Sequence, residues 1–224
     1  NRTQPEPFNF KLDKNDPKFL KENREIPTLT WIGHSTLLLQ HKGVNILTDP
    51  HLTQRASPFS FAGPQRSTPP GLSIEDLPII DLIVISHNHY DHLDKLTIKT
   101  LYERQPNHSP KIFVPLKLKQ WFLDLGIKNV TELDWKDSVK FGEWEIHAVP
   151  VQHWSSRTPF DRNKTLWAGW ILETEGFRFF FAGDTGYSKD FKNIGDQFGQ
   201  IDLAAIPIGA YEPRWFMKAA HVNP

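Results

Sequence analysis

The 224-residue chain contains no cysteine, and this absence removes several kinds of site at once. Without thiols there is no disulfide framework, no zinc site built on thiolates and no cysteine nucleophile. The compartment stays open, because disulfide-free proteins occur in the cytoplasm, in the periplasm and attached to membranes. A metal site in this chain would have to use histidine nitrogen and carboxylate oxygen.

The chain also lacks an excess of charge of either sign and any long apolar run. Lysine plus arginine number 26 and aspartate plus glutamate number 26, so the formal net charge is zero. A neutral balance gives no global field that attracts polyanions, and we expect no nucleic-acid partner. No apolar run approaches the roughly 18 residues needed to span a bilayer. Because the sequence starts at Asn1, it leaves open a leader or anchor further upstream.

Prolines and polar residues dominate residues 1–27, which predicts an extended N-terminal arm on the surface. Residues 53–78 form a proline-rich loop, and loops this long in compact domains are commonly functional. Helices are expected over 95–104, capped by Asp94, and over 116–126. The expected strands are TLTWIG, STLLLQ, VNILTDP, DLIVIS, KIFVP, SVKF, EWEIHAVPVQ, LWAGWILET, FRFFFAG and LAAIPIG. This alternation predicts one α/β domain over 28–224, built on antiparallel or mixed sheets.

Metal-capable side chains crowd into the stretch SHNHYDHLD that follows the buried run DLIVIS. His87 and His89 are two residues apart, so in an extended stretch both imidazoles project to one side and can share a metal. Asp91 and His92 follow on the turn and can reach a second metal close by. Since the chain has only ten histidines, chance clustering is a poor explanation.

Further donors follow other strand-like runs. His153 comes after HAVPVQ, Asp184 comes after FRFFFAG, and His221 lies near the end of the sequence. A strand that delivers a ligand at its end holds it on rigid backbone, as a metal site requires. The Asp184 carboxylate has two oxygens and could bridge two cations. These nitrogen and oxygen donors favour two zinc ions in a catalytic site, and iron or manganese also fits.

The remaining histidines carry no such pattern. We expect each of them to be structural or simply exposed, because a lone histidine usually is. They are His34, His41, His51, His108 and His147.

The motif H-N-H-Y-D-H at 87–92, followed by His153 and by Asp184 in G-D-T-G, resembles the metallo-β-lactamase fold superfamily of binuclear metal hydrolases. The stretches 55–64, 153–170, 179–187 and 202–224 are further similar to N-acylphosphatidylethanolamine-hydrolysing phospholipases D, and a bacterial relative is the interpretation we favour. The resemblance implies an αββα sandwich, that is, two mixed sheets flanked by helices with the metals at one edge.

The resemblance also implies roles for individual residues. One zinc would be held by His87, His89 and His153, the other by Asp91 and His92, with Asp184 as the bridge. His221 would line the active site and act in catalysis or phosphate binding, and Ser60 and Phe61 would lie at the mouth of a lipid-binding cavity. A further family histidine would lie beyond Pro224, so the domain is expected to be truncated at its C-terminus.

The function implied by this resemblance is zinc-dependent phosphodiester hydrolysis of the phospholipase D type. A hydroxide held between two metals would attack N-acylphosphatidylethanolamine and release N-acylethanolamine and phosphatidic acid. The phospholipid substrate makes contact with a membrane surface an expectation, and a homodimer is compatible with the sequence. The alternatives are a lactonase or a soluble phosphodiesterase on the same fold, and a non-catalytic module that binds lipid or a partner.

Overall fold

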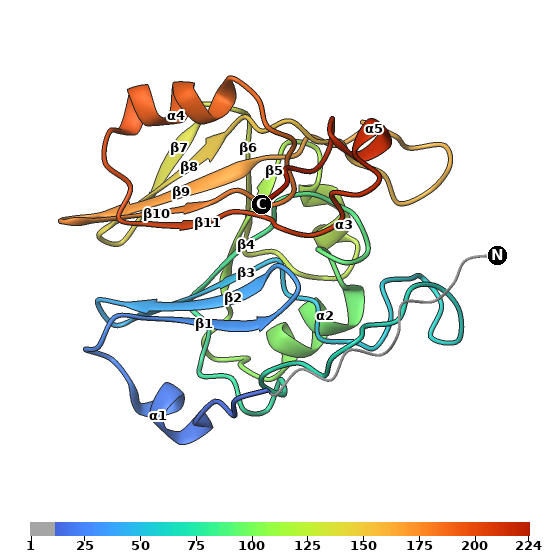
Figure 1. Cartoon of the computed structure of the whole chain (residues 1–224). Coiled ribbons are helices and arrows are strands. Elements are labelled where there is room, and N and C mark those ends of the chain that lie inside the picture. Colours follow the sequence, from blue (N-terminus) through green and yellow to red (C-terminus); the bar gives the residue numbers. More distant parts are fainter. Residues whose placement is uncertain (1–11) are drawn as a thin grey trace.

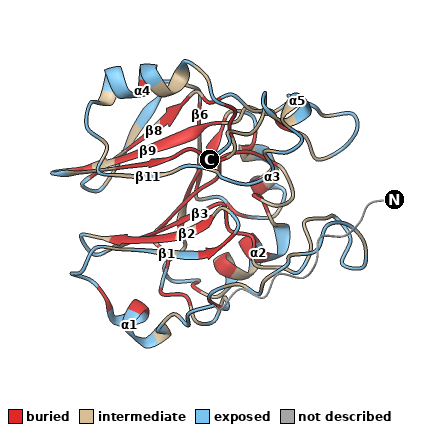
Figure 2. Cartoon of the chain, viewed as in Figure 1, coloured by how far each residue is buried: buried red, intermediate tan, exposed pale blue. Residues whose placement is uncertain are grey.

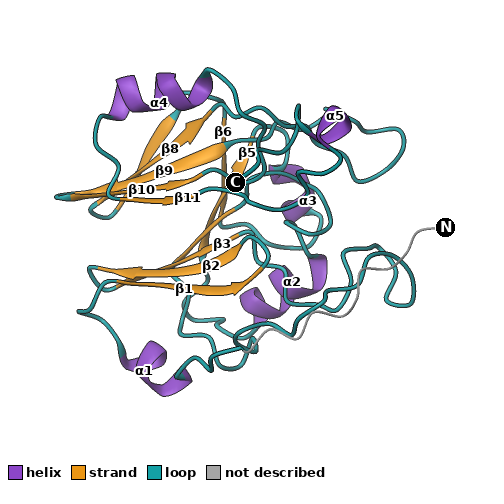
Figure 3. Ribbon diagram, in the orientation of Figure 1, coloured by secondary structure: helices purple, strands orange, loops and turns teal. Residues whose placement is uncertain are grey.

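Two mixed β-sheets lie face to face, and helices cover the outer side of each sheet (Figures 1 and 3). The computed structural model describes residues 12–224, so the first part of the predicted arm, 1–11, lies outside the described residues. This is the four-layered α/β arrangement that the sequence predicted. The two sheets meet over an apolar interior, which fixes the ends of their strands relative to one another.

The first sheet has six strands in chain order. Its first three are antiparallel, and the pairs from β3 to β6 are parallel. The strands are β1 (Thr28–Gly33), β2 (Thr36–His41), β3 (Val44–Thr48), β4 (Leu82–Val84), β5 (Lys111–Pro115) and β6 (Val130–Leu133). Parallel strands β3 and β4 therefore end at the same edge of the sheet.

The second sheet has five strands in the order β11-β10-β9-β8-β7. Only the pair β10 and β11 is parallel. The strands are β7 (Ser138–Phe141), β8 (Trp144–Val149), β9 (Gly169–Thr174), β10 (Phe177–Phe181) and β11 (Leu203–Ala205). Because β9 runs antiparallel to both β8 and β10, those two strands also end at a common edge.

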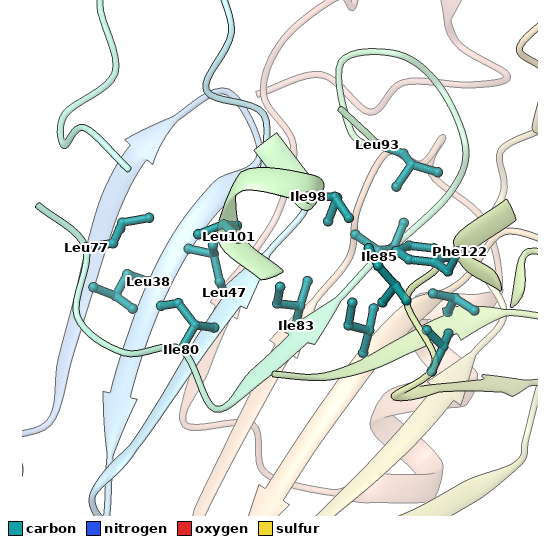
Figure 4. Packing of buried hydrophobic residues seen from close by; sticks show 14 of the residues in the cluster. Leu38, Leu47, Leu77, Ile80, Ile83, Ile85, Leu93, Ile98, Leu101 and Phe122 are labelled. Atoms are coloured by element: carbon teal, nitrogen blue, oxygen red, sulfur yellow. The ribbon is translucent and has the colours of Figure 1, made fainter. Parts of the chain in front are cut away.

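Apolar side chains of both sheets fill the space between them. Phe113 of the first sheet belongs to one cluster with Trp170 and Phe179 of the second, all three almost completely buried. Figure 2 shows that much of both sheets is coloured as buried. A second cluster lies on the outer face of the first sheet, where Ile98 and Leu101 pack with strand residues (Figure 4). Those two residues lie on α2 (Lys95–Glu103). Both faces of the central strands are thus buried, as expected for their near-continuous apolar runs.

Both predicted helices are present. Asp94 caps α2 through Leu96 N at 3.2 Å, which confirms that helix start. The second predicted helix is shorter than expected, since α3 covers only Lys119–Leu123 and the chain turns at Gly126 with φ of +79°. Strand β6 and the helices α4 (Asp190–Phe198) and α5 (Arg214–Met217) were not anticipated.

The prediction of a wholly extended arm was wrong for part of it. Residues 17–22 form α1 (Pro17–Glu22), in which Asp16 accepts hydrogen bonds from the backbone of Lys18 and Phe19. A capping aspartate followed by proline in the first turn favours a helix start, because proline needs no hydrogen-bond acceptor there. Among residues 12–224, no helix combines the length and apolar character that a bilayer crossing requires.

Candidate metal centre

The predicted metal-binding side chains meet at the edge where β3, β4, β8 and β10 end. His87, His89, Asp91 and His92 lie on the loop after β4, which runs on to α2. His153 follows β8 and Asp184 follows β10. The structure therefore brings donors from both sheets together, although the second sheet follows the first in the chain.

The first group of donors consists of three histidines. Nε2 of His87 lies 2.7 Å from Nδ1 of His89, and Nε2 of His153 lies 3.4 Å from the same Nδ1. One ring nitrogen from each residue falls within a set whose members are all within 4.8 Å of one another. Three imidazole nitrogens at this spacing form a donor set that is compatible with a single metal ion.

The second group lies beside the first. Nε2 of His92 is 3.7 Å from Oδ2 of Asp91 and 3.3 Å from Oδ2 of Asp184. The same Asp184 oxygen lies 3.9 Å from Nε2 of His153, which belongs to the first group. Asp184 thus stands between the two groups, where the sequence analysis expected a bridging carboxylate.

Hydrogen bonds on the far side of each imidazole fix its orientation. Nδ1 of His92 donates to Oδ2 of Asp49 at 2.7 Å, so Nε2 is the nitrogen of His92 left to bind a cation in place of a proton. Ser86 Oγ donates to the same carboxylate at 2.5 Å and accepts from Nδ1 of His87 at 2.8 Å. Nδ1 of His153 faces the carbonyl of Ala220 at 3.1 Å. Such outer partners set the ring orientation and the tautomer of metal-binding histidines.

Burial keeps the histidines of the first group neutral at neutral pH. Burial lowers the pKa of His89 to about 4, against the opposing effect of Asp91. Burial also lowers the pKa of His153 to about 4 and holds that of His87 well below its ordinary value. A neutral imidazole has a free lone pair, so these three side chains can bind a cation without first losing a proton.

The second group has a different electrostatic character. Burial alone would lower the pKa of His92, but the carboxylates of Asp184 and Asp91 raise it well above the ordinary value. Burial opposes ionisation of Asp184, yet His92 and His153 hold its pKa below the ordinary range. The pKa of Asp91 follows the same rule, with His92 and His34 outweighing burial. Ionised carboxylates are therefore ready to bind a cation here.

Close packing joins the two strand ends that carry the donors. Gly183, with φ of +60°, lies so near Ser86 that a Cβ built on it would come within 2.5 Å of the serine Cβ. The glycine before Asp184 is thus required both by its backbone conformation and by this approach. The backbone of Ala168 also donates to Ser86 O at 2.9 Å, which ties the second sheet to the loop after β4.

Arg157 clamps the loop that supplies four of the donors. Its Nη1 donates to the carbonyls of Asn88 at 2.9 Å and Leu93 at 2.7 Å. Its guanidinium also stacks over Tyr90, 3.9 Å from the ring centre. Residues from the β8–β9 connection therefore hold both ends of the metal-binding loop.

The predicted substrate residues lie around this centre. Nδ1 of His221 is 3.9 Å from Oδ2 of Asp184, and the His221 backbone is held by Arg214. Ser60 lines a cavity of about 570 Å³ together with Tyr90 of the metal-binding loop. Phe61 is 80% exposed and does not line that cavity. The roles of His221, Ser60 and Phe61 stay predictions.

Sequence reasoning missed two residues of the centre. Asp49 is fully buried and supports both His87 and His92, but in the sequence it stands as a single aspartate before proline. His34 was expected to be structural or exposed and is indeed exposed, but its Nε2 also lies 3.1 Å from Asp91 Oδ2 and 3.3 Å from His92 Nε2. In the sequence, both residues follow strand-like runs. This was the one signal available for either of them.

Known proteins are similar to this chain in sequence and in fold. The family described as "Beta-lactamase superfamily domain" matches residues 44–224. A Caenorhabditis elegans N-acyl-phosphatidylethanolamine-hydrolyzing phospholipase D is 49% identical over 87% of this chain and 57% of its own length. The mitochondrial enzyme of the same name from Saccharomyces cerevisiae is 38% identical over 87% of this chain and 42% of its own. The chain thus spans about half the length of the curated relatives it matches.

A solved structure supports the fold independently. A possible metal-dependent hydrolase from Veillonella parvula superimposes with a TM-score of 0.65 at 21% identity, over 83% of this chain and 72% of that one. At this identity the likeness speaks for the fold alone. Together, the two-sheet architecture, the donors at its edge and these matches show that the chain belongs to the β-lactamase superfamily, with the metallo-β-lactamase fold.

Proposed function

We propose that the chain is a metal-dependent phosphodiesterase of the phospholipase D type that hydrolyses N-acylphosphatidylethanolamine. The observation that carries the proposal is the pair of donor groups joined at Asp184, in a chain 49% identical to the C. elegans enzyme of that name. Hydrolysis would add water across the bond between phosphorus and the ethanolamide oxygen. The products would be phosphatidic acid and an N-acylethanolamine.

The residues present fit two metal ions, which we expect to be zinc. His87, His89 and His153 would hold one ion, and Asp91 and His92 would hold the other. When bound, two such ions would supply an activated water and offset the negative charge on the phosphate. Asp49 and Ser86 would keep the imidazoles in the tautomers that binding requires.

Two residues beside the donors would act on the reactants. Asp184 faces both groups, so its carboxylate is placed to orient a water by accepting a hydrogen bond. His221, on the side of Asp184 towards the end of the chain, is a candidate to bind the phosphate or to assist the departure of the alcohol. Both assignments would place a side chain beside the reacting groups, as catalysis by positioning requires.

The cavity beside the metal-binding loop supports an amphiphilic, anionic substrate. Its walls include the apolar side chains of Phe59, Leu96 and Trp121 and the ammonium-bearing residues Lys95 and Lys99. Apolar walls with a few charged groups are typical of small-molecule sites, and they would suit a lipid that carries a phosphate.

The test is product analysis with purified, metal-loaded protein and N-acylphosphatidylethanolamine in mixed micelles. Mass spectrometry is expected to detect both products, and Asp184→Asn is expected to abolish them while leaving the circular dichroism spectrum unchanged. Soluble phosphodiesters and lactones serve as parallel substrates. Hydrolysis of those compounds by a protein that leaves the lipid intact would overturn the proposed substrate and keep the metal centre.

A further inference from the structure

The second donor group contains one nitrogen more than the family resemblance assigns to it within this chain. His34 lies in the turn between β1 and β2, far in sequence from the loop after β4, yet its Nε2 faces Asp91 Oδ2 at 3.1 Å and His92 Nε2 at 3.3 Å. The ring centres of His34 and His92 are 4.9 Å apart, in an edge-to-face arrangement. These contacts make the β1–β2 turn part of the wall of the centre.

The separations match those of ligands around one tetrahedral ion. With metal–nitrogen and metal–oxygen distances near 2.0–2.1 Å, tetrahedral geometry places neighbouring donor atoms about 3.3 Å apart. Nε2 of His34 meets this spacing with both of its neighbours, at 3.1 and 3.3 Å. The other two distances at this group, from His92 Nε2 to Asp184 and to Asp91, are 3.3 and 3.7 Å.

The direction of the lone pairs agrees with a shared cation. The Nδ1 proton of His92 is committed to Asp49 at 2.7 Å, so Nε2 is the nitrogen of His92 that faces His34 and that would bind a cation in place of a proton. Two imidazole nitrogens at 3.3 Å need a proton or a cation between them. A metal ion would satisfy both nitrogens and the Asp91 carboxylate at once.

The turn is built to hold His34 in place. His34 has φ of +51°, a left-handed conformation that histidine adopts more readily than most side chains. Its carbonyl accepts a hydrogen bond from Nε1 of Trp31 at 2.9 Å. Thr36, just after the turn, donates to the carbonyl of Asp49, the residue whose carboxylate holds His92. Asp49 therefore contacts both the β1–β2 turn and the imidazole of His92.

We propose that His34 is a ligand of the second metal ion, beside Asp91 and His92. The ion would then have three donors whose atoms lie within 4.8 Å of one another, and its binding would depend on the β1–β2 turn. This inference concerns the metal alone and holds for any substrate. It predicts that loss of the His34 imidazole weakens the binding of the second ion and leaves the binding of the first unchanged.

The test counts metal ions and measures their affinity without using activity. The chain is stripped with a chelator and dialysed against buffered concentrations of free Zn²⁺, and bound zinc is measured by mass spectrometry. Titration with Co²⁺ follows, because its visible spectrum reports the number and kind of ligands. The unmodified chain is expected to take up two ions.

Two substitutions separate a ligand from a residue that only orients its neighbour. His34→Asn keeps a side chain that tolerates the left-handed backbone but cannot reach the ion. His34→Gln can still donate a hydrogen bond to Asp91 and is a poor zinc ligand. Both variants are expected to bind the second ion at least about tenfold more weakly. This is the lower end of the effect seen when a supporting group of a metal site is lost, and a direct ligand should matter at least as much. His108→Asn, at an exposed histidine paired with Asp81, is the matched control and should bind both ions normally.

Each outcome decides the matter. Retention of the first ion with normal affinity shows that a variant is folded, and weakening of the second ion in both variants supports the proposal. Normal binding of the second ion by His34→Asn would overturn it. Weak binding by His34→Asn with normal binding by His34→Gln would also overturn it, making His34 a positioning residue for Asp91. A chain that binds only one ion before any substitution would contradict it as well.

Discussion

Buried polar side chains behind the donors decide how this centre works at the scale of single residues. Asp49 has no solvent exposure and accepts hydrogen bonds from Ser86 N, Ser86 Oγ and His92 Nδ1. Through these bonds one carboxylate orients one imidazole in each donor group. Loss of such a supporting group typically costs about 10- to 100-fold in metal affinity, by general experience with metal sites.

Asp49→Asn is therefore expected to weaken the binding of the second metal by about 10- to 100-fold. The amide presents an N–H group as well as an oxygen, so it cannot accept every hydrogen bond that the carboxylate accepts. Equilibrium dialysis against buffered zinc measures the effect. Ser86→Ala is the matched control, because it removes the hydrogen-bond partner of His87 and keeps the Asp49–His92 bond. It should weaken the binding of the first metal instead. Equal binding by all three proteins would contradict this account.

The pKa values of the first group predict how the metal-free chain responds to acid. His89 and His153 have pKa values of about 4 in the folded chain, against 6.5 for an unperturbed histidine, so the unfolded chain binds more protons between these values. The free energy of unfolding should then fall as pH drops from 6.5 towards 4. His92 has a raised pKa, so it contributes no loss of stability on acidification through this window.

Chemical denaturation of the metal-free chain at about pH 7, 6 and 5 would measure this slope. His153→Gln should reduce it by close to one proton, because glutamine does not titrate. A free energy of unfolding that rises on acidification through this range would contradict the assigned pKa directions.

At the scale of elements, the loop after β4 depends on a segment far along the chain. Arg157, in the β8–β9 connection, binds the carbonyls of Asn88 and Leu93 and covers Tyr90. A guanidinium makes these two bonds from fixed geometry, whereas a lysine ammonium is a single point charge on a flexible stem. The clamp therefore sets the shape of the loop that carries four donors.

Arg157→Lys is expected to loosen this loop while leaving the sheets intact. Hydrogen bonds to charged groups contribute about 1.5–3 kcal/mol each, so if lysine keeps one of the two bonds, the local opening free energy should fall by about 1.5–3 kcal/mol. Amide hydrogen exchange should accelerate across residues 88–93 and stay constant in β9 and β10. Unchanged exchange in the loop would show that Arg157 does not hold it.

Elements that are determined by local sequence signals could be predicted from the sequence. Roles that depend on contacts between distant segments could not. The strands and the start of α2 were predictable, since apolar runs and a capping aspartate are local signals. The short helix α1 was also locally encoded, by Asp16 and Pro17, and was overlooked because the surrounding prolines suggested an extended chain. Asp49 and His34 were not predictable in their roles, because those roles come from the pairing of β3 with β4 and from the β1–β2 turn.

At the scale of the whole molecule, the packing of one sheet on the other assembles the centre. The first sheet carries His87 to His92 and the second carries His153 and Asp184, so neither sheet holds a complete set of donors. Phe113, Trp170 and Phe179 occupy the interior between them. The apolar interior and the donor cluster therefore depend on the same arrangement of the two sheets.

Phe179→Ala should lower the free energy of unfolding by about 3–5 kcal/mol, because it removes a fully buried ring between the sheets. Phe61→Ala is the matched control, at a ring that is 80% exposed, and should change that free energy by no more than about 0.5 kcal/mol. Urea denaturation of both variants measures the difference. Equal stabilities would contradict the assigned core.

The most direct test of the central claim is hydrolysis of N-acylphosphatidylethanolamine in water enriched with the heavy oxygen isotope. The account predicts that metal-loaded protein places one heavy oxygen in the phosphatidic acid and none in the N-acylethanolamine, because water attacks phosphorus at the metal centre. The label and both products should disappear with Asp184→Asn. Heavy oxygen in the N-acylethanolamine, or lipid left intact by a fully metal-loaded chain, would contradict the account.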